Sequence, residues 1–187
     1  MNSQQKNLVS AIGALVVAAV LVLGMGLDLF GWMYTDADHA NEEVVTTTSA
    51  TATVWRITDG DTINIDVATG SDFVRLIGID TPEIDWEASG RPEAACFGWE
   101  ARDFLVGKLE GETVRLVGDP RQPSVDEYDR RLAYVYLDGE LINQTLLEEG
   151  YARELTVGDG YEKQESFRAA EEAARQEGTG LWAVCEE

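Results

Sequence analysis

Residues 62–79 read TINIDVATGSDFVRLIGI and contain two stretches in which apolar and polar residues alternate. A period of two is typical of a strand with one buried face, so Thr62–Val67 and Phe73–Ile79 are predicted strands. Residues 69–72 between them read TGSD and supply a turn. The stretch therefore predicts an up-and-back pair of strands.

Three more strands and three helices are predicted on either side of this pair. The further strands are Val54–Ile57, Thr113–Val117 and Leu132–Leu137. Apolar residues at helical spacing and glycine stops predict helices over Phe97–Leu109, Asn143–Glu149 and Tyr161–Glu177, with Asn143 as an N-cap. Five strands with added helices fit an α+β domain built on a five-stranded closed barrel of the OB type.

An apolar run occupies residues 8–27, after a short polar tail over residues 1–7 that carries Lys6. At ~1.5 Å per residue the run is long enough to cross a hydrocarbon core of ~30 Å as a transmembrane helix. A cleaved signal peptide is the alternative, although its apolar region is usually only ~7–15 residues long. A buried soluble helix is a third interpretation, which the lack of a polar face disfavours.

Residues 28–52 are polar, rich in threonine and alanine, and predict a tether, so a globular domain is expected over residues 53–187. Lys6 precedes the apolar run, whereas acidic residues follow it. This asymmetry favours an N-terminus inside the cell and a domain outside it. The expected location is the cell surface, with a membrane anchor, or secretion after signal cleavage.

The formal net charge is −21, from 35 acidic and 14 basic residues. A surface of this sign repels nucleic acids over long range, because steering of a polyanion needs positive charge. At molar ionic strength the Debye length falls to ~3 Å and such repulsion is largely screened. The acidic surplus with few lysines resembles haloarchaeal proteins, and it favours a halophilic protein over an ordinary acidic soluble domain.

The chain has two cysteines, Cys96 and Cys185. In a domain on the oxidising side of a membrane they favour one disulfide bond, with an entropic benefit of at most ~4–5 kcal/mol. Two free buried thiols are the alternative. Metal binding by these cysteines is disfavoured because the lone histidine, His39, lies in the tether.

The densest group of chemically active residues lies around the predicted strand pair. Asp59-Gly60-Asp61-Thr62 surrounds the start of the first strand, and Asp80-Thr81-Pro82-Glu83 follows the second. Antiparallel pairing can bring Asp61 and Asp80 together, and carboxylates near a main-chain carbonyl suit a hard cation such as Ca²⁺. Each piece alone also occurs in ordinary turns and helix starts. Their combination predicts a cation site with Glu83 close by.

These residues recur in an order that resembles the thermonuclease, or staphylococcal-nuclease, family. The matching segments, in register over about residues 53–183, are Asp59–Thr62, Val74–Glu83, Phe97–Ala101, Asp126–Tyr136, Asn143, Gly150–Ala152 and Gly180–Trp182. The resemblance implies an OB barrel with three helices and a calcium-dependent phosphodiesterase. It implies endonucleolytic and exonucleolytic cleavage of DNA and RNA at the 5′ P–O bond, leaving 3′-phosphates. A monomer is expected.

The resemblance also implies a role for each matching residue. The implied Ca²⁺ ligands are Asp61, Asp80 and the carbonyl of Thr81. Glu83 corresponds to the residue that orients or deprotonates the attacking water. Arg75 and Arg130 correspond to the pair that binds the scissile phosphate, a task that suits the planar, bidentate guanidinium group.

Two residues depart from the family pattern. Glu127 stands where a lysine is common, and Asp129 replaces a glycine before the second catalytic arginine. Both add negative charge beside the expected phosphate site. Between them, Tyr128 matches a family aromatic residue that lies near the nucleotide, and packing of its own loop is the alternative role.

Two other functions remain as alternatives. A non-catalytic OB module that binds nucleic acid would have lost Glu83 or one of the two arginines, and all three are present. A calcium-stabilised adhesion domain would keep the two aspartates but would have no need of arginines beside them.

Overall fold

The computed structural model describes residues 49–67, 70–86 and 92–186. The predicted tail over residues 1–7, the predicted membrane span over residues 8–27 and most of the predicted tether lie outside this part of the chain. Within the described part, no helix is both long enough and apolar enough to cross a membrane.

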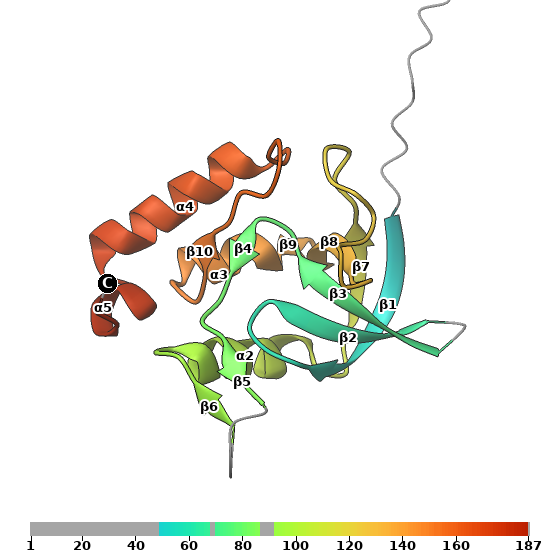
Figure 1. Ribbon diagram of the computed structural model, residues 1–187, viewed down its shortest axis with the longest axis horizontal. Helices are drawn as coiled ribbons and strands as arrows, with labels where there is room; N and C mark the ends of the chain where they lie inside the picture. Colours follow the sequence, from blue (N-terminus) through green and yellow to red (C-terminus); the bar gives the residue numbers. More distant parts are fainter. Residues whose placement is uncertain (1–48, 68–69, 87–91, 187) are drawn as a thin grey trace, which may run out of the picture. The chain divides into compact units, whose positions relative to one another are not determined.

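Five strands form a closed barrel (Figure 1). They are β1 (Ser49–Ile57), β2 (Thr62–Val67), β3 (Gly70–Leu76), β7 (Thr113–Val117) and β8 (Arg131–Leu137). They pair in the order β3-β2-β1-β7-β8, with antiparallel neighbours, and a parallel pairing of β3 with β8 closes the barrel. The predicted five-stranded barrel of the OB type is therefore confirmed.

The first strand begins earlier than the sequence predicts. β1 starts at Ser49, so residues 49–52, predicted as the end of the tether, belong to the barrel. Their side chains are mostly exposed, so apolar and polar residues do not alternate in this part of the sequence. The segment is held as a strand by main-chain pairing with β7, from Ser49↔Val117 to Thr53↔Thr113.

The predicted strand Phe73–Ile79 is divided into two. β3 ends at Leu76, and the short strand β4 (Ile79–Asp80) starts after Gly78, whose φ is 79°. A Cβ on Gly78 would lie 2.6 Å from the ring of Tyr161, so glycine is required there. The bend directs the chain out of the barrel and into pairing with β10 (Arg153–Glu154), which places Asp80 opposite Arg153.

Three further short strands lie outside the predicted set. β5 (Ile84–Asp85) pairs with β6 (Glu93–Ala94), and β9 (Glu140–Leu141) extends β8 through a hairpin. Pairs this short have too few residues to show a period of two, so the sequence pattern did not reveal them.

The three predicted helices are present with adjusted ends. They are α2 (Gly98–Leu109), α3 (Ile142–Glu148) and α4 (Gln164–Glu177), and a fourth, α5 (Leu181–Val184), has four residues. α3 packs against β8 and α4, while α2 packs against β1. In Figure 1, α4 and α5 lie together at one side of the domain and α2 at another.

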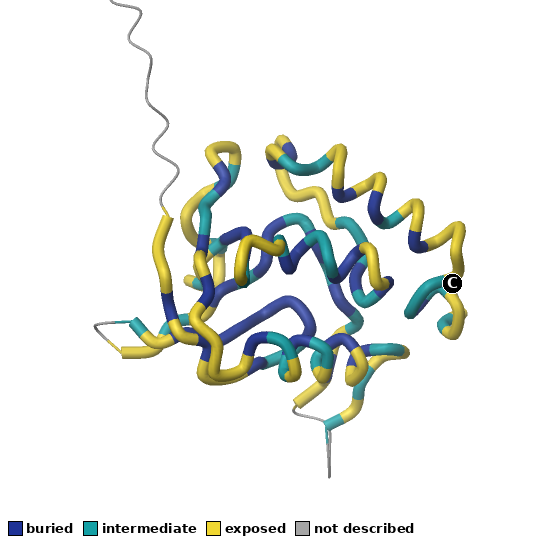
Figure 2. Tube along the Cα trace, turned by 180° about the vertical axis from the view of Figure 1, so that it is seen from behind, coloured by how far each residue is buried: buried dark blue, intermediate teal, exposed yellow. Residues whose placement is uncertain are grey.

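Buried residues line the inside of the barrel and the inner faces of the helices (Figure 2). Asn143 is fully buried and is not the N-cap of α3, a position that Leu141 occupies without a side-chain bond. Its amide oxygen accepts a hydrogen bond from the main chain of Val135, and its nitrogen donates to Ile77 and Ala133. The side chain thus joins β8 to the residue that follows β3, where the barrel closes.

Candidate active site

Asp61 lies at the start of β2 and is buried, with 3% of its surface exposed. Its carboxylate accepts hydrogen bonds from the main-chain and side-chain groups of Thr81, at 3.0 and 3.2 Å, and from the hydroxyl of Thr62. A Cβ on the preceding Gly60 would lie 2.8 Å from Thr81 and Ala101. Glycine at position 60 therefore allows the turn before β2 to approach the Thr81 segment closely.

Arg75 on β3 connects the two predicted cation ligands. One terminal nitrogen, Nη1, lies 2.9 Å from Oδ2 of Asp61, and the other, Nη2, lies 3.1 Å from Oδ1 of Asp80. Nη1 also donates to the carbonyl of Ile79. The guanidinium is thus fixed between a carboxylate just before β2 and one beyond the end of β3, which antiparallel pairing brings to the same end of the strand pair.

Acidic groups concentrate at this point. Burial and the charge of Asp61 raise the pKa of Asp59 to about 7. Burial and the charge of Asp61 also raise the pKa of Asp80, and burial with the charges of Asp61 and Asp80 raises that of Glu83. Four carboxylates therefore repel one another here, which is the arrangement that a bound cation stabilises.

The donor set fits a calcium ion. In the described residues, no three His, Cys, Asp or Glu side chains come together closely enough to hold a metal. Asp61 and Asp80 would therefore need main-chain oxygen and water as further ligands. Calcium takes six to eight oxygen ligands, commonly including carbonyls and water, so two carboxylates with Thr81 suit it better than they suit zinc.

Glu83 follows the cation site in the sequence, and among the described residues no hydrogen bond holds its carboxylate. Its side chain is exposed, whereas its carbonyl accepts a hydrogen bond from the main chain of Ala95 at 2.9 Å. Positive charges on Arg75 and Arg130 partly offset the burial that raises the pKa of Glu83, so both guanidiniums lie within electrostatic range.

Arg130 comes from the loop before β8 and is held by Asp126. Its Nε and Nη2 both lie 2.7 Å from Oδ2 of Asp126. Burial acts to raise the pKa of Asp126, but hydrogen bonds from Arg130 and Tyr128 outweigh it and lower that pKa. The sequence did not single out Asp126, because a spacing of four residues indicates contact only on a helix and residues 126–130 form an irregular loop.

The departure at Asp129 is accommodated by the loop. Asp129 has a φ of 60°, in the left-handed region where glycine is usual and aspartate is tolerated better than most residues. Its amide donates to the carbonyl of Asp126, closing the turn. The substitution therefore preserves the turn that presents Arg130.

A cleft of about 580 Å³ opens beside the two arginines. Its walls include Arg75, Arg130, Glu127 and Tyr128, and its inner lining is mainly apolar. The cleft residues that carry this apolar lining are Leu76, Ile77, Ile79, Val125, Leu132, Leu155 and Val157. Tyr128 is 70% exposed and its ring lies 5.2 Å from the guanidinium of Arg130.

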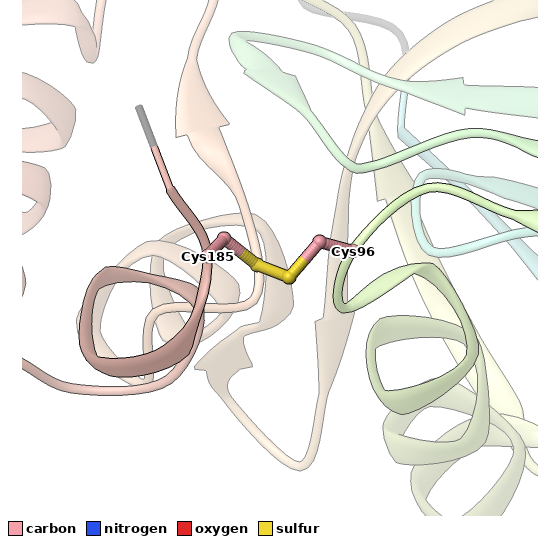
Figure 3. The surroundings of a disulfide bond; sticks show 2 residues. All are labelled: Cys96 and Cys185. Carbon is pink, nitrogen blue, oxygen red and sulfur yellow. A yellow bond between two sulfur atoms is a disulfide. The ribbon is translucent and has the colours of Figure 1, made fainter.

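Cys96 and Cys185 form a disulfide bond (Figure 3). The bond joins the residue just before the N-terminus of α2 to the residue that follows α5. Segments 89 residues apart in the sequence are thereby tied together next to the Asp80–Pro82 turn, whose residues line one small cavity with both cysteines.

A closed barrel carries an acid cluster in which Arg75 bridges the buried Asp61 and the half-exposed Asp80, and these features define the class of this protein. The chain belongs to the family of staphylococcal nuclease homologues, whose family model matches residues 73–184.

Its relatives among curated proteins are similar over most of the chain. It is 34% identical over 170 residues to the thermonuclease of Staphylococcus hyicus, which covers 90% of this chain and 94% of that protein. It is 33% identical over 163 residues to the thermonuclease of Staphylococcus intermedius, with 87% and 92% covered. Endonuclease YncB of Bacillus subtilis is 36% identical over 138 residues, covering 70% of this chain and 60% of that protein.

Proposed function

We propose that the chain is a calcium-dependent nuclease that hydrolyses phosphodiester bonds of DNA and RNA at the 5′ P–O bond and leaves 3′-phosphates. The observation that carries the proposal is the grouping of Arg75, Arg130 and Glu83 around Asp61 and Asp80, with both arginines lining one cleft. The names of the relatives, two thermonucleases and an endonuclease, support it.

The cation site consists of Asp61, Asp80 and the main-chain carbonyl of Thr81. When bound, Ca²⁺ supplies positive charge that neutralises a phosphodiester oxygen and favours attack at phosphorus. Thr81 and Arg75 hold the carboxylate of Asp61 in place through hydrogen bonds before any substrate arrives. The site is therefore preorganised.

The two arginines bind the scissile phosphate. Each guanidinium can donate two parallel hydrogen bonds to phosphate oxygens, and it does so more strongly as charge builds up on them during attack. Arg75 is fixed by the aspartates and Arg130 by Asp126. Little side-chain entropy remains to be lost when the phosphate binds.

Glu83 accepts the proton of the attacking water. The water oxygen forms a bond to phosphorus, its proton passes to the Glu83 carboxylate, and the bond from phosphorus to the 5′ oxygen breaks. The departing oxygen takes up a proton from solvent, and the phosphate remains on the 3′ side. A raised pKa makes this carboxylate a stronger base than an ordinary glutamate.

Hydrolysis of single-stranded DNA with Ca²⁺, and with excess chelator, is the first test. Activity is expected with Ca²⁺ and should disappear with chelator, while full activity in chelator would exclude the cation assignment. Glu83→Gln, Arg75→Ala and Arg130→Ala should each lower turnover by at least ~10²-fold. Glu112→Gln, an exposed carboxylate on the loop before β7, is the control. DNA binding without hydrolysis would indicate a binding module instead.

The proposal extends to location. A monomer held at the cell surface by residues 8–27, or secreted after their cleavage, agrees with a disulfide bond, because disulfides persist in oxidising compartments. Mass spectrometry of the natural protein would decide between the two, since an intact N-terminus is expected for the anchored form.

A further inference from the structure

We propose that the Cys96–Cys185 disulfide positions Glu83 for catalysis, by fixing the segment Glu93–Gly98 on which the main chain of Glu83 rests. The inference depends on the proposed function, in which Glu83 activates water. The disulfide is not among the groups proposed to bind the phosphate or the cation, although both cysteines share a small cavity with Asp80 and Thr81.

Glu83 is held mainly through its main chain. Its carbonyl accepts the hydrogen bond from Ala95 at 2.9 Å, and the next two residues pair with β6 as Ile84↔Ala94 and Asp85↔Glu93. Gly98 lies so close that a Cβ there would be 2.9 Å from the Pro82 carbonyl and 3.2 Å from that of Glu83. The place of Glu83 is therefore set by segment 93–98.

Segment 93–98 contains a strained residue. Phe97, the N-cap of α2, has a φ of 72°, although it is neither glycine nor a residue that adopts this region readily. Such a conformation persists only where the surrounding structure enforces it. The constraints on Phe97 are the bonded Cys96 on one side, the start of α2 on the other, and a ring contact with Tyr151 at 5.6 Å.

The far end of the disulfide is anchored in the domain. Leu181 is 1% exposed, and its amide donates to the carbonyl of Gly150 at 2.8 Å. Cys185 in turn donates its amide to the carbonyl of Leu181 at 2.9 Å. As Figure 3 shows, the sulfur atoms then cross from α5 to the turn before α2. The bond thus connects segment 93–98 to the core through α5.

Loss of this bond should affect turnover more than binding. The groups that bind phosphate, Arg75 and Arg130, lie on a barrel strand or beside one, outside segment 93–98, as does Asp61. Asp80 and Thr81 share a small cavity with Ala95 and both cysteines, so kcat and KM are compared at saturating Ca²⁺. The place of Glu83 does depend on segment 93–98. Misplacement of a catalytic group by about 1 Å can cost ~10²-fold in rate, so kcat should fall while KM is nearly unchanged.

The full chain with Cys96→Ser and Cys185→Ser together is the test protein. Val114→Ala, a buried change on β7, is the control for lost stability. At a temperature where all variants are folded, we expect the double serine variant to lose about tenfold or more in kcat, with KM within about twofold. Equal kcat in the double variant and the wild type would overturn the inference.

Two further readouts separate positioning from general stability. In a Glu83→Gln background, removal of the disulfide should cause little additional loss of kcat, because the group that it positions is already absent. Losses that multiply would indicate a role other than positioning Glu83. An inactive wild type with Ca²⁺ would refute the proposed nuclease instead.

Amide hydrogen exchange tests the same inference without activity. The amides of Ala95 and Gly98, which donate to Glu83 and Ala95, should exchange faster in the double serine variant. The Val114→Ala control should leave their exchange unchanged relative to global stability. Unchanged protection of both amides in the double variant would overturn the inference whatever the nuclease assay shows.

Discussion

Arg75 forms ion pairs with two of the four carboxylates in the acid cluster. Its guanidinium, 11% exposed, compensates Asp61 and Asp80 directly. Asp59 forms no ion pair with any residue that the structure describes, and burial next to Asp61 raises its pKa to about 7. In the absence of calcium, ionisation of Asp59 therefore opposes folding.

The raised pKa of Asp59 makes the free energy of unfolding depend on pH. The pKa of Asp59 is higher in the folded chain, about 7, than its ordinary value of 3.8, so the folded state binds its proton more tightly. The resulting stability is complete below pH 3.8 and is lost as the pH rises through about 7. Asp59→Asn, which keeps an acceptor for the amide of Asp61, should be more stable than wild type at pH 8 in chelator.

Denaturant unfolding at pH 4 and pH 8 measures this difference. The advantage of Asp59→Asn should shrink toward pH 4, where the wild-type group is protonated. Asp66→Asn, at an exposed position on β2, serves as the control and should show no such trend. A constant difference between Asp59→Asn and wild type at both pH values would contradict the assignment.

Asp126 gives a second prediction for a single residue. Its carboxylate holds Arg130 through Nε and Nη2 and also accepts the amide of Tyr128. Asp126→Ala should release the guanidinium and lower kcat/KM by about tenfold, since a charge-assisted hydrogen bond contributes ~1.5–3 kcal/mol. Glu127→Gln, the adjacent acid that lines the cleft, should not lower it. An equal loss in both variants would refute the positioning role of Asp126.

The roles of single residues could be predicted from the sequence where the residues belong to motifs. Roles that depend on contacts between distant parts of the chain were missed. Asp61, Arg75 and Asp80 lie at the ends of a recognisable strand pair, and the structure brings them into contact. Asp126 acts within an irregular loop that has no periodicity. Asn143 was expected to cap a helix, because an asparagine at a helix start usually does, but its partners are distant in sequence.

At the level of strands and helices, the side chain of Asn143 stabilises the closure of the barrel. Asn143 bonds Val135 on β8 and Ile77, the residue after β3, across the parallel β3–β8 contact. Asn143→Ala should lower the free energy of unfolding by about 2–4 kcal/mol, because it leaves buried main-chain groups without partners. Gln144→Ala, its partly buried neighbour in α3, should cost much less.

Thermal or denaturant unfolding checks this expectation. If Asn143→Ala were no less stable than Gln144→Ala, the bridging bonds would contribute nothing to barrel closure. The core of β8 should also lose amide protection first in Asn143→Ala, since the amide of Val135 is the donor that is released.

Elements with a clear period were predicted well and short ones were not. β7 alternates exposed and buried residues, and the sequence of β2 alternates polar and apolar residues although its first four residues are all buried. β8 is a mainly apolar run with three consecutive buried residues, so these strands were recognisable from the sequence. β4, β5, β6 and β10 have two residues each and are formed by tertiary pairing. These short strands carry or flank the Asp80–Glu83 segment. The backbone of the site therefore lies where the local sequence says least about secondary structure.

For the whole molecule, the charge of −21 sets the response to salt. Proteins that neutralise Z phosphates normally lose affinity as salt rises, with log K falling by ~0.7Z per tenfold change for single strands. Here Arg75 and Arg130 are the basic groups proposed at the phosphate, so Z is small. Repulsion between an acidic domain and a polyanion acts over a longer range, and salt screens it first.

We therefore expect kcat/KM on single-stranded DNA to rise between ~0.1 M and molar NaCl, a range over which the Debye length falls from ~10 to ~3 Å. The free energy of unfolding should rise over the same range, because screening also reduces self-repulsion in the fold. Circular dichroism at each salt concentration checks that the protein is folded. A steady decline in kcat/KM of folded protein would show that local basic contacts outweigh the overall charge.

The two-sided pairing of β1 has a mechanical consequence. β1 is bonded to β2 on one side and to β7 on the other, both antiparallel. Residues Ser49–Thr53 pair with β7 and Thr53–Ile57 pair with β2. A pull on Ser49 along the strand therefore loads the β7 ladder first, in shear, and its hydrogen bonds share the load rather than failing one at a time. If the strand did yield, the Cys96–Cys185 bond would keep the residues between the two cysteines, 89 apart in sequence, from being pulled out, about 300 Å of extension at ~3.4 Å per residue. A domain of this construction would resist drag at its N-terminus and would stay short even after its barrel had opened.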